Sequence, residues 1–184
     1  MIGVIYIVVI AVILIIIYLS IAFSKLSKDI KKIKIIKYND EYFKETENFV
    51  NKSMHVFINL PYEKREDVLN IKDYYLKNNG IFYIALYKNK IIGTLGIENK
   101  GKIGVLKRFY IKKSFQKMGI GNKLYEKVEK FAREKTEIKT IVLVCNRILK
   151  GAHRFYKHHG YKKVKKFDFP IPHRGRVYYF EKNL

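Results

Sequence analysis

A change of hydrophobic period at Gly119 constrains the fold of this chain more than any other feature. The apolar run Phe109–Ile111 before it is typical of a short strand, whereas the apolar residues after it recur at helical spacing, at Ile120, Leu124, Val128 and Phe131. Gly119 and Gly121 let the backbone approach a ligand closely, and the free N–H groups at the start of a helix favour a phosphate or pyrophosphate. The alternative is that the two glycines serve only the turn.

A second motif follows downstream, from Ala152 to Tyr161, and reads AHRFYKHHGY after the apolar run Thr140–Cys145. The two motifs together resemble the signature of the GNAT superfamily of acetyl-CoA-dependent N-acetyltransferases, Q/R-x-x-G-x-G/A followed by A-x-x-F-Y-x-x-x-G-F/Y. The resemblance covers roughly Ile33 to Leu184 and is strongest from Leu106 to Tyr161. It implies an α/β (α+β) fold with a mixed, mostly antiparallel central sheet flanked by helices.

By this resemblance the cosubstrate is acetyl-CoA, and no metal is expected. The pyrophosphate of acetyl-CoA would lie on backbone N–H groups of the glycine turn, and its pantetheine arm would run beside the preceding strand as an added strand. The cofactor-binding residues implied are Phe109, Tyr110 and Ile111 from the strand and Gln116, Lys117, Met118, Gly119, Ile120, Gly121 and Asn122 from the turn.

The resemblance also implies catalytic roles. Backbone N–H groups of Phe109–Ile111 would stabilise the oxyanion that forms when an amine attacks the thioester. Tyr156 would protonate the departing thiolate. Donation from a phenol with a pKa near 10 to a thiolate near 8.5 is unfavourable by about 2 kcal/mol, so the expected assistance is roughly 10²-fold. The alternative is a Tyr156 that only packs beside Phe155.

The base that deprotonates the amine is left open by the sequence. Glu98, at the end of a predicted central strand, is the first candidate, directly or through water, and His153 and His173 are alternatives. Many family members carry an asparagine where this chain has Leu149, and Gly151 lies early in the expected helix. The cofactor contact of this second motif is therefore open as well.

Composition indicates one folded domain with a short appendage. The chain has 184 residues, of which 48% are hydrophobic, enough for one core and hardly for two. Lys and Arg outnumber Asp and Glu by 38 to 16, a formal charge of +22. This excess favours an acidic partner, unless it reflects a general bias toward Lys, Ile, Asn and Tyr. The single Cys145 excludes an internal disulfide and a Cys-rich metal site, and its apolar surroundings favour a buried thiol.

The N-terminal stretch Ile2–Phe23 contains no charged residue. A helix of that length reaches about 33 Å, enough to cross a hydrocarbon core of about 30 Å, so residues 1–23 are predicted to be a transmembrane anchor. The alternative, a cleaved signal peptide, would need a basic n-region and an A-x-A cleavage site, and neither pattern is present.

The segment that follows the predicted anchor is basic. It comprises a linker, residues 24–32, and the start of the domain 33–184. Its charged residues are the lone Asp29 and Lys25, Lys28, Lys31, Lys32, Lys34 and Lys37. Positive flanks stay in the cytoplasm, which predicts a single-pass membrane protein with its N-terminus outside and its catalytic domain cytoplasmic. The lysines are also expected to contact anionic lipid; the alternative is a solvated linker that only fixes the orientation.

Hydrophobic period and turn residues predict the remaining elements in order. Asp40 is expected to cap the first helix, and Ser53–Tyr62 to be an irregular connection. The predicted helices are Asp40–Lys52, Glu63–Leu76, one starting at the glycine turn, and Leu149–His159. The predicted strands are Ile33–Tyr38, Ile81–Tyr87, Lys90–Glu98, Lys102–Ile111, Ile138–Cys145, Tyr161–Phe169 and Arg176–Glu181.

Taken together, these features predict an acetyl-CoA-dependent acetyltransferase whose acceptor is a primary amine of a small molecule or a protein. One alternative is an acetyl-CoA-binding sensor without turnover. Another is a basic module on a membrane tether that docks on lipid or nucleic acid, of which nucleic acid is the less favoured partner. The identity of the acceptor and the oligomeric state are left open.

Overall fold

The computed structural model describes residues 10–21, 24, 32–59, 61, 64–165, 167 and 176–184. The chain forms two compact units, Met1–Lys34 and Ile35–Leu184.

In the N-terminal unit, residues 10–21 form a helix whose large apolar side chains are exposed, up to 71% for Tyr18. The other parts of the expected anchor, residues 1–9 and 22–23, lie outside the described residues, as do residues 25–31 of the linker. Across the part of the chain that is described, no helix combines the length and the apolar character needed to cross a bilayer. The structure therefore gives no support for the anchor expected from the sequence.

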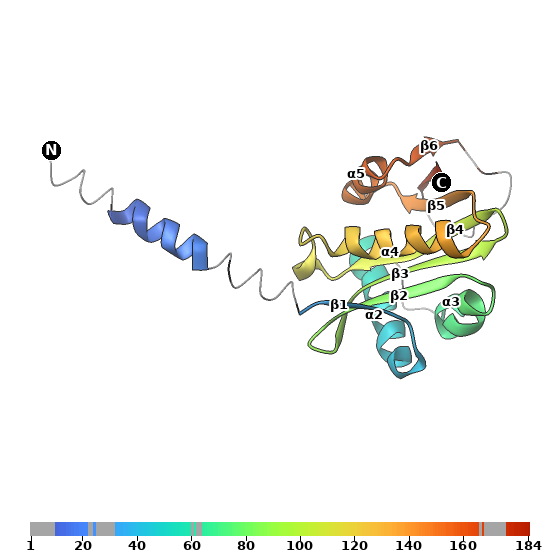
Figure 1. The fold of residues 1–184 in the computed structure, drawn as a ribbon, viewed down its shortest axis with the longest axis horizontal. Helices are drawn as coiled ribbons and strands as arrows, with labels where there is room; N and C mark the ends of the chain where they lie inside the picture. Colours follow the sequence, from blue (N-terminus) through green and yellow to red (C-terminus); the bar gives the residue numbers. More distant parts are fainter. Residues whose placement is uncertain are drawn as a thin grey trace. The chain divides into compact units, whose positions relative to one another are not determined.

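The described part of the second unit is built on a seven-stranded sheet with the order β1-β2-β3-β4-β5-β7-β6 (Figure 1). Strands β4 and β5 pair in parallel, whereas β2–β3, β3–β4, β5–β7 and β6–β7 are antiparallel. The predicted mixed, mostly antiparallel sheet is thereby confirmed. The strands are β1 (Lys34–Lys37), β2 (Ile81–Tyr87), β3 (Lys90–Lys100), β4 (Ile103–Ile111), β5 (Thr140–Asn146), β6 (Lys162–Val164) and β7 (Val177–Asn183).

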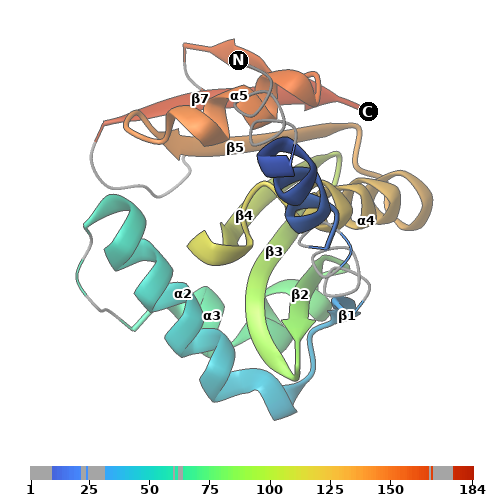
Figure 2. The same ribbon diagram turned by 90° about the vertical axis from the view of Figure 1, so that its left-hand side faces the viewer.

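Helices cover both faces of this sheet. Figure 2 shows α2 and α4 on opposite sides of strands β2 to β4. Helix α4 also makes the crossover that a parallel β4–β5 pair requires. The helical segments are η1 (Asp40–Tyr42), α2 (Phe43–Ile58), α3 (Glu66–Leu69), the π-helical turn η2 (Lys72–Leu76), η3 (Lys113–Phe115), α4 (Ile120–Lys135) and α5 (Lys150–His158).

The first helical region differs from its prediction at both ends. Asn39, rather than Asp40, is the cap, because its side-chain oxygen accepts a hydrogen bond from the Glu41 N–H at 3.0 Å. Helix α2 continues to Ile58, so most of the connection expected to be irregular is helical. The buried Val50 and Met54 pack in one cluster with Val68, and this tertiary contact supports the added turn.

The single helix predicted over Glu63–Leu76 is wrong. The segment forms α3 and the turn η2, separated at Asn70, whose φ of −129° and ψ of 49° are not helical. The wider π turn fits the position of Tyr75, which is fully buried and donates its hydroxyl hydrogen to Asp67 Oδ2 at 2.8 Å.

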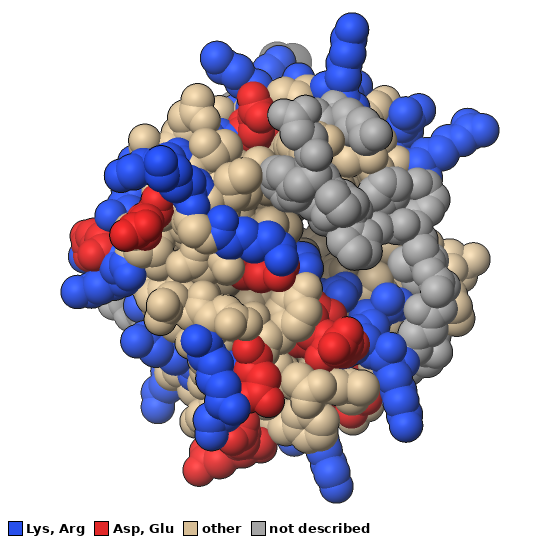
Figure 3. Space-filling model, turned by 90° about the vertical axis from the view of Figure 1, so that its right-hand side faces the viewer, with Lys and Arg blue, Asp and Glu red and all other residues tan. Residues whose placement is uncertain are grey.

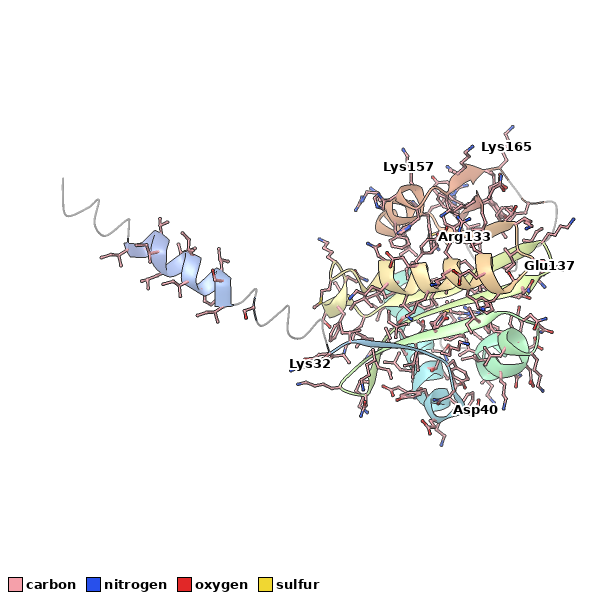
Figure 4. The ribbon with its side chains drawn as sticks, viewed as in Figure 1. Lys32, Asp40, Arg133, Glu137, Lys157 and Lys165 are labelled. Carbon is pink, nitrogen blue, oxygen red and sulfur yellow. The ribbon has the colours of Figure 1, made fainter. Side chains whose placement is uncertain are left out.

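Positive charge is spread over the face of the molecule that Figure 3 shows. Figure 3 shows Lys and Arg side chains distributed over one face, with Asp and Glu side chains between them. Lys157 of α5 and Lys165 after β6 point away from the body of the domain (Figure 4). On the face that Figure 3 shows, the excess charge is therefore not gathered over one element.

Candidate functional site

Strands β4 and β5 lie side by side only at their beginnings. Their pairing covers Ile103–Val105 and Thr140–Val142, although β4 continues to Ile111 and β5 to Asn146. Beyond these three positions the two strands are not paired with each other. The edge of β4 from Leu106 onward therefore has backbone groups available for another partner.

A cavity of about 510 Å³ opens where the strands separate. It is lined by β4, β5, α2 and α5, by α3 and the segment before it, by Tyr74 of η2 and by Val177 of β7. The lining includes Met54, Asp67, Tyr74, Lys107, Arg108, Phe109, Tyr110, Cys145 and Tyr156.

Strand β4 carries a bulge at this cavity. Thr94 pairs with Tyr110 and Gly96 with Lys107, so β4 holds one residue more than β3 between these pairs. Arg108 lies in the bulge with a φ of +56°, and its carbonyl accepts a hydrogen bond from Thr94 Oγ1 at 2.7 Å. Phe109 is the second residue of the bulge, and Tyr110 is the first residue after it.

A buried ion pair joins this bulge to α3. Arg108 donates from Nε to Asp67 Oδ2 at 2.7 Å and from Nη2 to Asp67 Oδ1 at 2.6 Å. Burial alone would raise the pKa of the Asp67 carboxyl, but the hydrogen bonds and charge of Arg108 outweigh it and lower that pKa. Asp67 is therefore a fixed anion and a poor base.

Tyr156 reaches the cavity from α5. Its ring contacts those of Phe109, Tyr161 and Phe180 with centroid separations of 6.3, 5.6 and 5.7 Å. Burial raises the pKa of Tyr156 well above that of an ordinary phenol, so the hydroxyl stays protonated and can donate. Burial likewise raises the pKa of Cys145 to about 12, which leaves a neutral thiol at the cavity wall.

The glycine turn has the predicted form. Gly119 is the residue before α4 and has a φ of +76°. Because glycine has no side chain, the residue at the cap position offers no side-chain acceptor to the first N–H groups of α4. A side-chain carbon at Gly121 would lie 3.4 Å from Phe109 Cζ. Because Phe109 also lines the cavity, the turn and the cavity share a wall.

The other predicted cofactor residues surround this turn. Gln116 Nε2 donates to the carbonyl of Ile111 at 3.1 Å, which ties the loop to the end of β4. Lys117 and Met118 complete the loop, with a φ of +62° at Lys117. Ile120 and Asn122 lie in the first turn of α4, where Asn122 Oδ1 is 3.2 Å from His159 Nε2.

Glu98 is not among the residues that line the cavity with Tyr156. Its carboxylate lies 2.8 Å from Lys100 Nζ and 2.7 Å from Lys107 Nζ. Burial opposes ionisation of Glu98, yet the hydrogen bonds from these lysines outweigh it and lower the pKa. Its link to the cavity is indirect, through Lys107 and through the Tyr74 hydroxyl at 3.3 Å, both of which line it.

Of the two histidines considered as bases, the structure describes only His153, which is not among the residues that line the cavity. His153 Nε2 is 2.9 Å from the carbonyl oxygen of Asn146, and its ring contacts Tyr178 and Phe180. His173 lies outside the described residues. Leu149, which replaces the asparagine of many family members, lines the cavity. Among the described side chains, no group of three His, Cys, Asp or Glu residues is arranged to hold a metal ion.

The polar cavity residues that sequence reasoning missed include Asp67, Tyr74, Lys107 and Arg108. One signal was available in the strand sequence Leu106–Ile111, where the cations Lys107 and Arg108 are adjacent. In a half-buried strand, single polar residues normally alternate with apolar ones. Asp67 and Tyr74 carry no such signal, since both lie in a segment with ordinary helical composition.

Comparison with known proteins gives a consistent family. The model of the acetyltransferase (GNAT) family matches residues 40–161. A probable N-acetyltransferase, camello, from Xenopus tropicalis is 29% identical over 105 residues, 55% of this chain and 48% of the relative. The match thus spans about half the length of this curated relative.

Solved structures show the same fold. An acetyltransferase of the GNAT family from Staphylococcus aureus is 28% identical, with a TM-score of 0.74 over 82% of this chain and 98% of its own. An acetyltransferase from Streptococcus agalactiae is 26% identical, with a TM-score of 0.76 over 83% and 99%. PaiA N-acetyltransferase from Thermoplasma acidophilum, solved in complex with coenzyme A, is 21% identical with a TM-score of 0.68 over 83% and 99% and shares the fold.

The Asp67–Arg108 pair predicts a pH-dependent contribution to stability. Because the pKa of Asp67 is lowered in the folded protein, its stabilisation is present above the unfolded pKa of about 3.9 and is lost as the pH falls through the folded value. Asp67→Asn is expected to lower the free energy of unfolding by about 3 kcal/mol at pH 7, and the difference from the wild type should shrink below about pH 4.

Urea unfolding of both proteins from pH 7 to pH 3 measures this difference. Asp73→Asn is the matched control, because Asp73 pairs with Lys77 at 2.6 Å on the surface, where such pairs contribute less than about 1 kcal/mol. A difference for Asp67→Asn that does not change with pH would contradict the prediction.

Proposed function

Because the chain belongs to the GNAT family of acetyltransferases, which use acetyl-CoA as cosubstrate, we propose that it transfers the acetyl group of acetyl-CoA to a primary amine. The observation that carries the proposal is the cavity between the diverging strands β4 and β5, which shares the Phe109 wall with the glycine turn and contains Tyr156. The acceptor, a small molecule or a protein amine, is unidentified.

Two features support the proposed binding of acetyl-CoA. The edge of β4 beyond Val105 has no pairing with β5, and an extended pantetheine arm with its two amides suits such an edge. The first N–H groups of α4 suit the pyrophosphate because the positive end of the helix dipole lies there. Phe109, Tyr110 and Ile111 would contact the arm, and residues 116–122 the phosphates.

The proposed reaction is a direct attack. The neutral amine nitrogen forms a bond to the thioester carbon, and the carbonyl oxygen becomes an oxyanion held by backbone N–H groups of Phe109–Ile111. When the carbon–sulfur bond breaks, the thiolate takes the proton of the Tyr156 hydroxyl, and the phenolate regains a proton from water once the thiol has left. The raised pKa of Tyr156 keeps this proton in place until the thiolate forms beside it.

The proposed route for the acceptor's proton runs through Tyr74 to Glu98, because the Tyr74 hydroxyl lines the cavity and donates to Glu98 Oε2. The lowered pKa of Glu98 makes it a weak base, so in this route it would hold the proton only briefly before passing it on to water. Burial of Lys107 opposes its charge, but hydrogen bonds to Glu98 and Tyr74 outweigh this and raise its pKa, so Lys107 remains a cation. Its charge favours entry of the acceptor as a neutral amine.

Gly119→Ala tests the glycine turn. A methyl group at Gly119 meets no protein atom within 4 Å, so the steric conflict expected from it is with a phosphate bound in the proposed site. The positive φ adds strain of about 1–2 kcal/mol. The Kd of the full-length protein for acetyl-CoA, measured by titration calorimetry, is expected to rise about tenfold or more.

The matched control is Gly101→Ala in the turn between β3 and β4. Gly101 has a φ of +70° and equally open surroundings, so it carries the same strain far from the cavity lining. Gly101→Ala should lower stability and leave the Kd for acetyl-CoA unchanged. Equal weakening in both variants would reject the turn as the phosphate site.

Tyr156→Phe tests the general acid. Loss of the proton donor is expected to lower turnover about 10²-fold, while the Kd for acetyl-CoA stays within about twofold because the ring packing is retained. Thiol release is measured with acetyl-CoA and spermidine, an aminoglycoside and a peptide with a free N-terminus as acceptors.

Tyr161→Phe is the control for this variant, because the Tyr161 hydroxyl lies 3.3 Å from the Tyr125 hydroxyl and outside the cavity lining. Unchanged turnover in Tyr156→Phe would remove the residue from the mechanism. Tight binding of acetyl-CoA by the wild type without thiol release for any amine would favour the sensor function instead.

We further propose that residues 1–23 anchor the protein in a membrane, with the N-terminus outside and the catalytic domain cytoplasmic. What supports this proposal is the sequence: no charged residue from Ile2 to Phe23 and six lysines from Lys25 to Lys37. After expression in a bacterial host, the full-length chain should remain with the membranes on alkaline carbonate extraction. Release of the full-length chain into the supernatant would exclude the anchor.

A further inference from the structure

Arg108 has an unusual backbone conformation for its position. Six non-glycine residues in the described part of the chain have positive φ, and five of them lie in turns or at a helix end, whereas Arg108 lies inside β4. The left-handed conformation costs an L-residue about 1–2 kcal/mol and persists only where its surroundings hold it.

The surroundings of Arg108 hold both its backbone and its side chain. Its carbonyl accepts the hydrogen bond from Thr94 Oγ1, and Thr94 is fully buried. Its Nε and Nη2 bind the two carboxylate oxygens of Asp67, and Nη1 lies 3.3 Å from Met54 Sδ. Asp67 is itself fixed by the Tyr75 hydroxyl. All three guanidinium nitrogens contact the protein, so the Arg108 side chain is held in one position.

These contacts join two walls of the same cavity. Met54 of α2 and Asp67 of α3 lie on one wall. Phe109, the second residue of the bulge, and Tyr110, which follows it, lie on the other. The direction of the backbone N–H groups after a bulge depends on the backbone conformation at the bulge. The ion pair can therefore affect the backbone of Phe109–Ile111, which would contact the thioester in the proposed function. The ion pair itself would not contact the reacting atoms.

We propose that Arg108, held by Asp67, is a positioning residue that aims backbone N–H groups of Phe109–Ile111 at the thioester carbonyl. This inference rests on the proposed function, in which these groups stabilise the oxyanion. Binding of the phosphates is assigned to the glycine turn and does not depend on Arg108. Loss of the ion pair should thus reduce polarisation of the carbonyl while leaving the affinity for acetyl-CoA nearly unchanged.

Difference infrared spectroscopy of carbonyl-labelled [1-¹³C]acetyl-CoA on the full-length protein tests the proposal without an acceptor. In the wild type, the thioester C=O band should lie at lower wavenumber than in free acetyl-CoA. Arg108→Gly permits the positive φ but removes the side chain, and it should lose about half or more of this shift. Its Kd for acetyl-CoA should stay within about threefold of the wild type.

A second variant removes the contact that holds the backbone of the bulge. Thr94→Val has nearly the same shape but lacks the hydroxyl that binds the Arg108 carbonyl, so it should also reduce the shift. It keeps the proposal testable if Arg108→Gly does not fold. Arg108→Lys retains the charge without the two-point contact to Asp67 and should recover only part of the shift.

The control is Lys182→Met, which breaks another partly buried ion pair. Lys182 Nζ lies 2.8 Å from Glu129 Oε1, both side chains are under 20% exposed, and neither residue lines the cavity. Lys182→Met should lower the melting temperature and keep the full carbonyl shift, which separates loss of stability from loss of positioning.

A full shift in Arg108→Gly or in Thr94→Val, with acetyl-CoA bound and the wild type shifted, would overturn the positioning role and leave the proposed function intact. A wild type that fails to bind acetyl-CoA would instead overturn the proposed function, and the positioning role with it.

Discussion

The short parallel contact between β4 and β5 is the constraint on which the rest of the structure depends. Two parallel strands need a crossover, and α4 supplies it, so the glycine turn lies in the connection between β4 and α4. Because pairing ends at Val105 and Val142, the later part of β4 keeps one edge without a strand partner. A cavity, a strand edge and a helix N-terminus are thus brought together by a single topological feature.

Ion pairs with largely buried side chains join secondary-structure elements in this domain. Asp67–Arg108 connects α3 to β4, Glu98–Lys107 connects β3 to β4, and Glu129–Lys182 connects α4 to β7. Each pair carries a desolvation cost, so a pair adds little net stability but strongly disfavours any arrangement that separates its partners. The pairs at the cavity therefore serve geometry more than they serve stability.

Sequence patterns predicted the elements that depend mainly on residues close together in the chain. The three antiparallel strands Ile81–Ile111, the start of α4 and the residues of the glycine turn agree with the structure because turn residues and hydrophobic period specify them directly. Two predictions failed because tertiary contacts overrode the local signals. Packing of Met54 with Val68 extends α2, and burial of Tyr75 against Asp67 is associated with the π turn in place of a regular helix.

By itself, the sequence determined the order of the elements, the glycine turn after a strand and the aromatic motif around Tyr156, since each is written in residues close together in the chain. Only the tertiary structure decided that Asp67 pairs with Arg108, that β4 bulges there, and that Glu98 reaches the cavity indirectly through Tyr74 and Lys107. The physical reason is that these contacts join residues from different elements, and their energies depend on burial and distance, which exist only once the chain has folded.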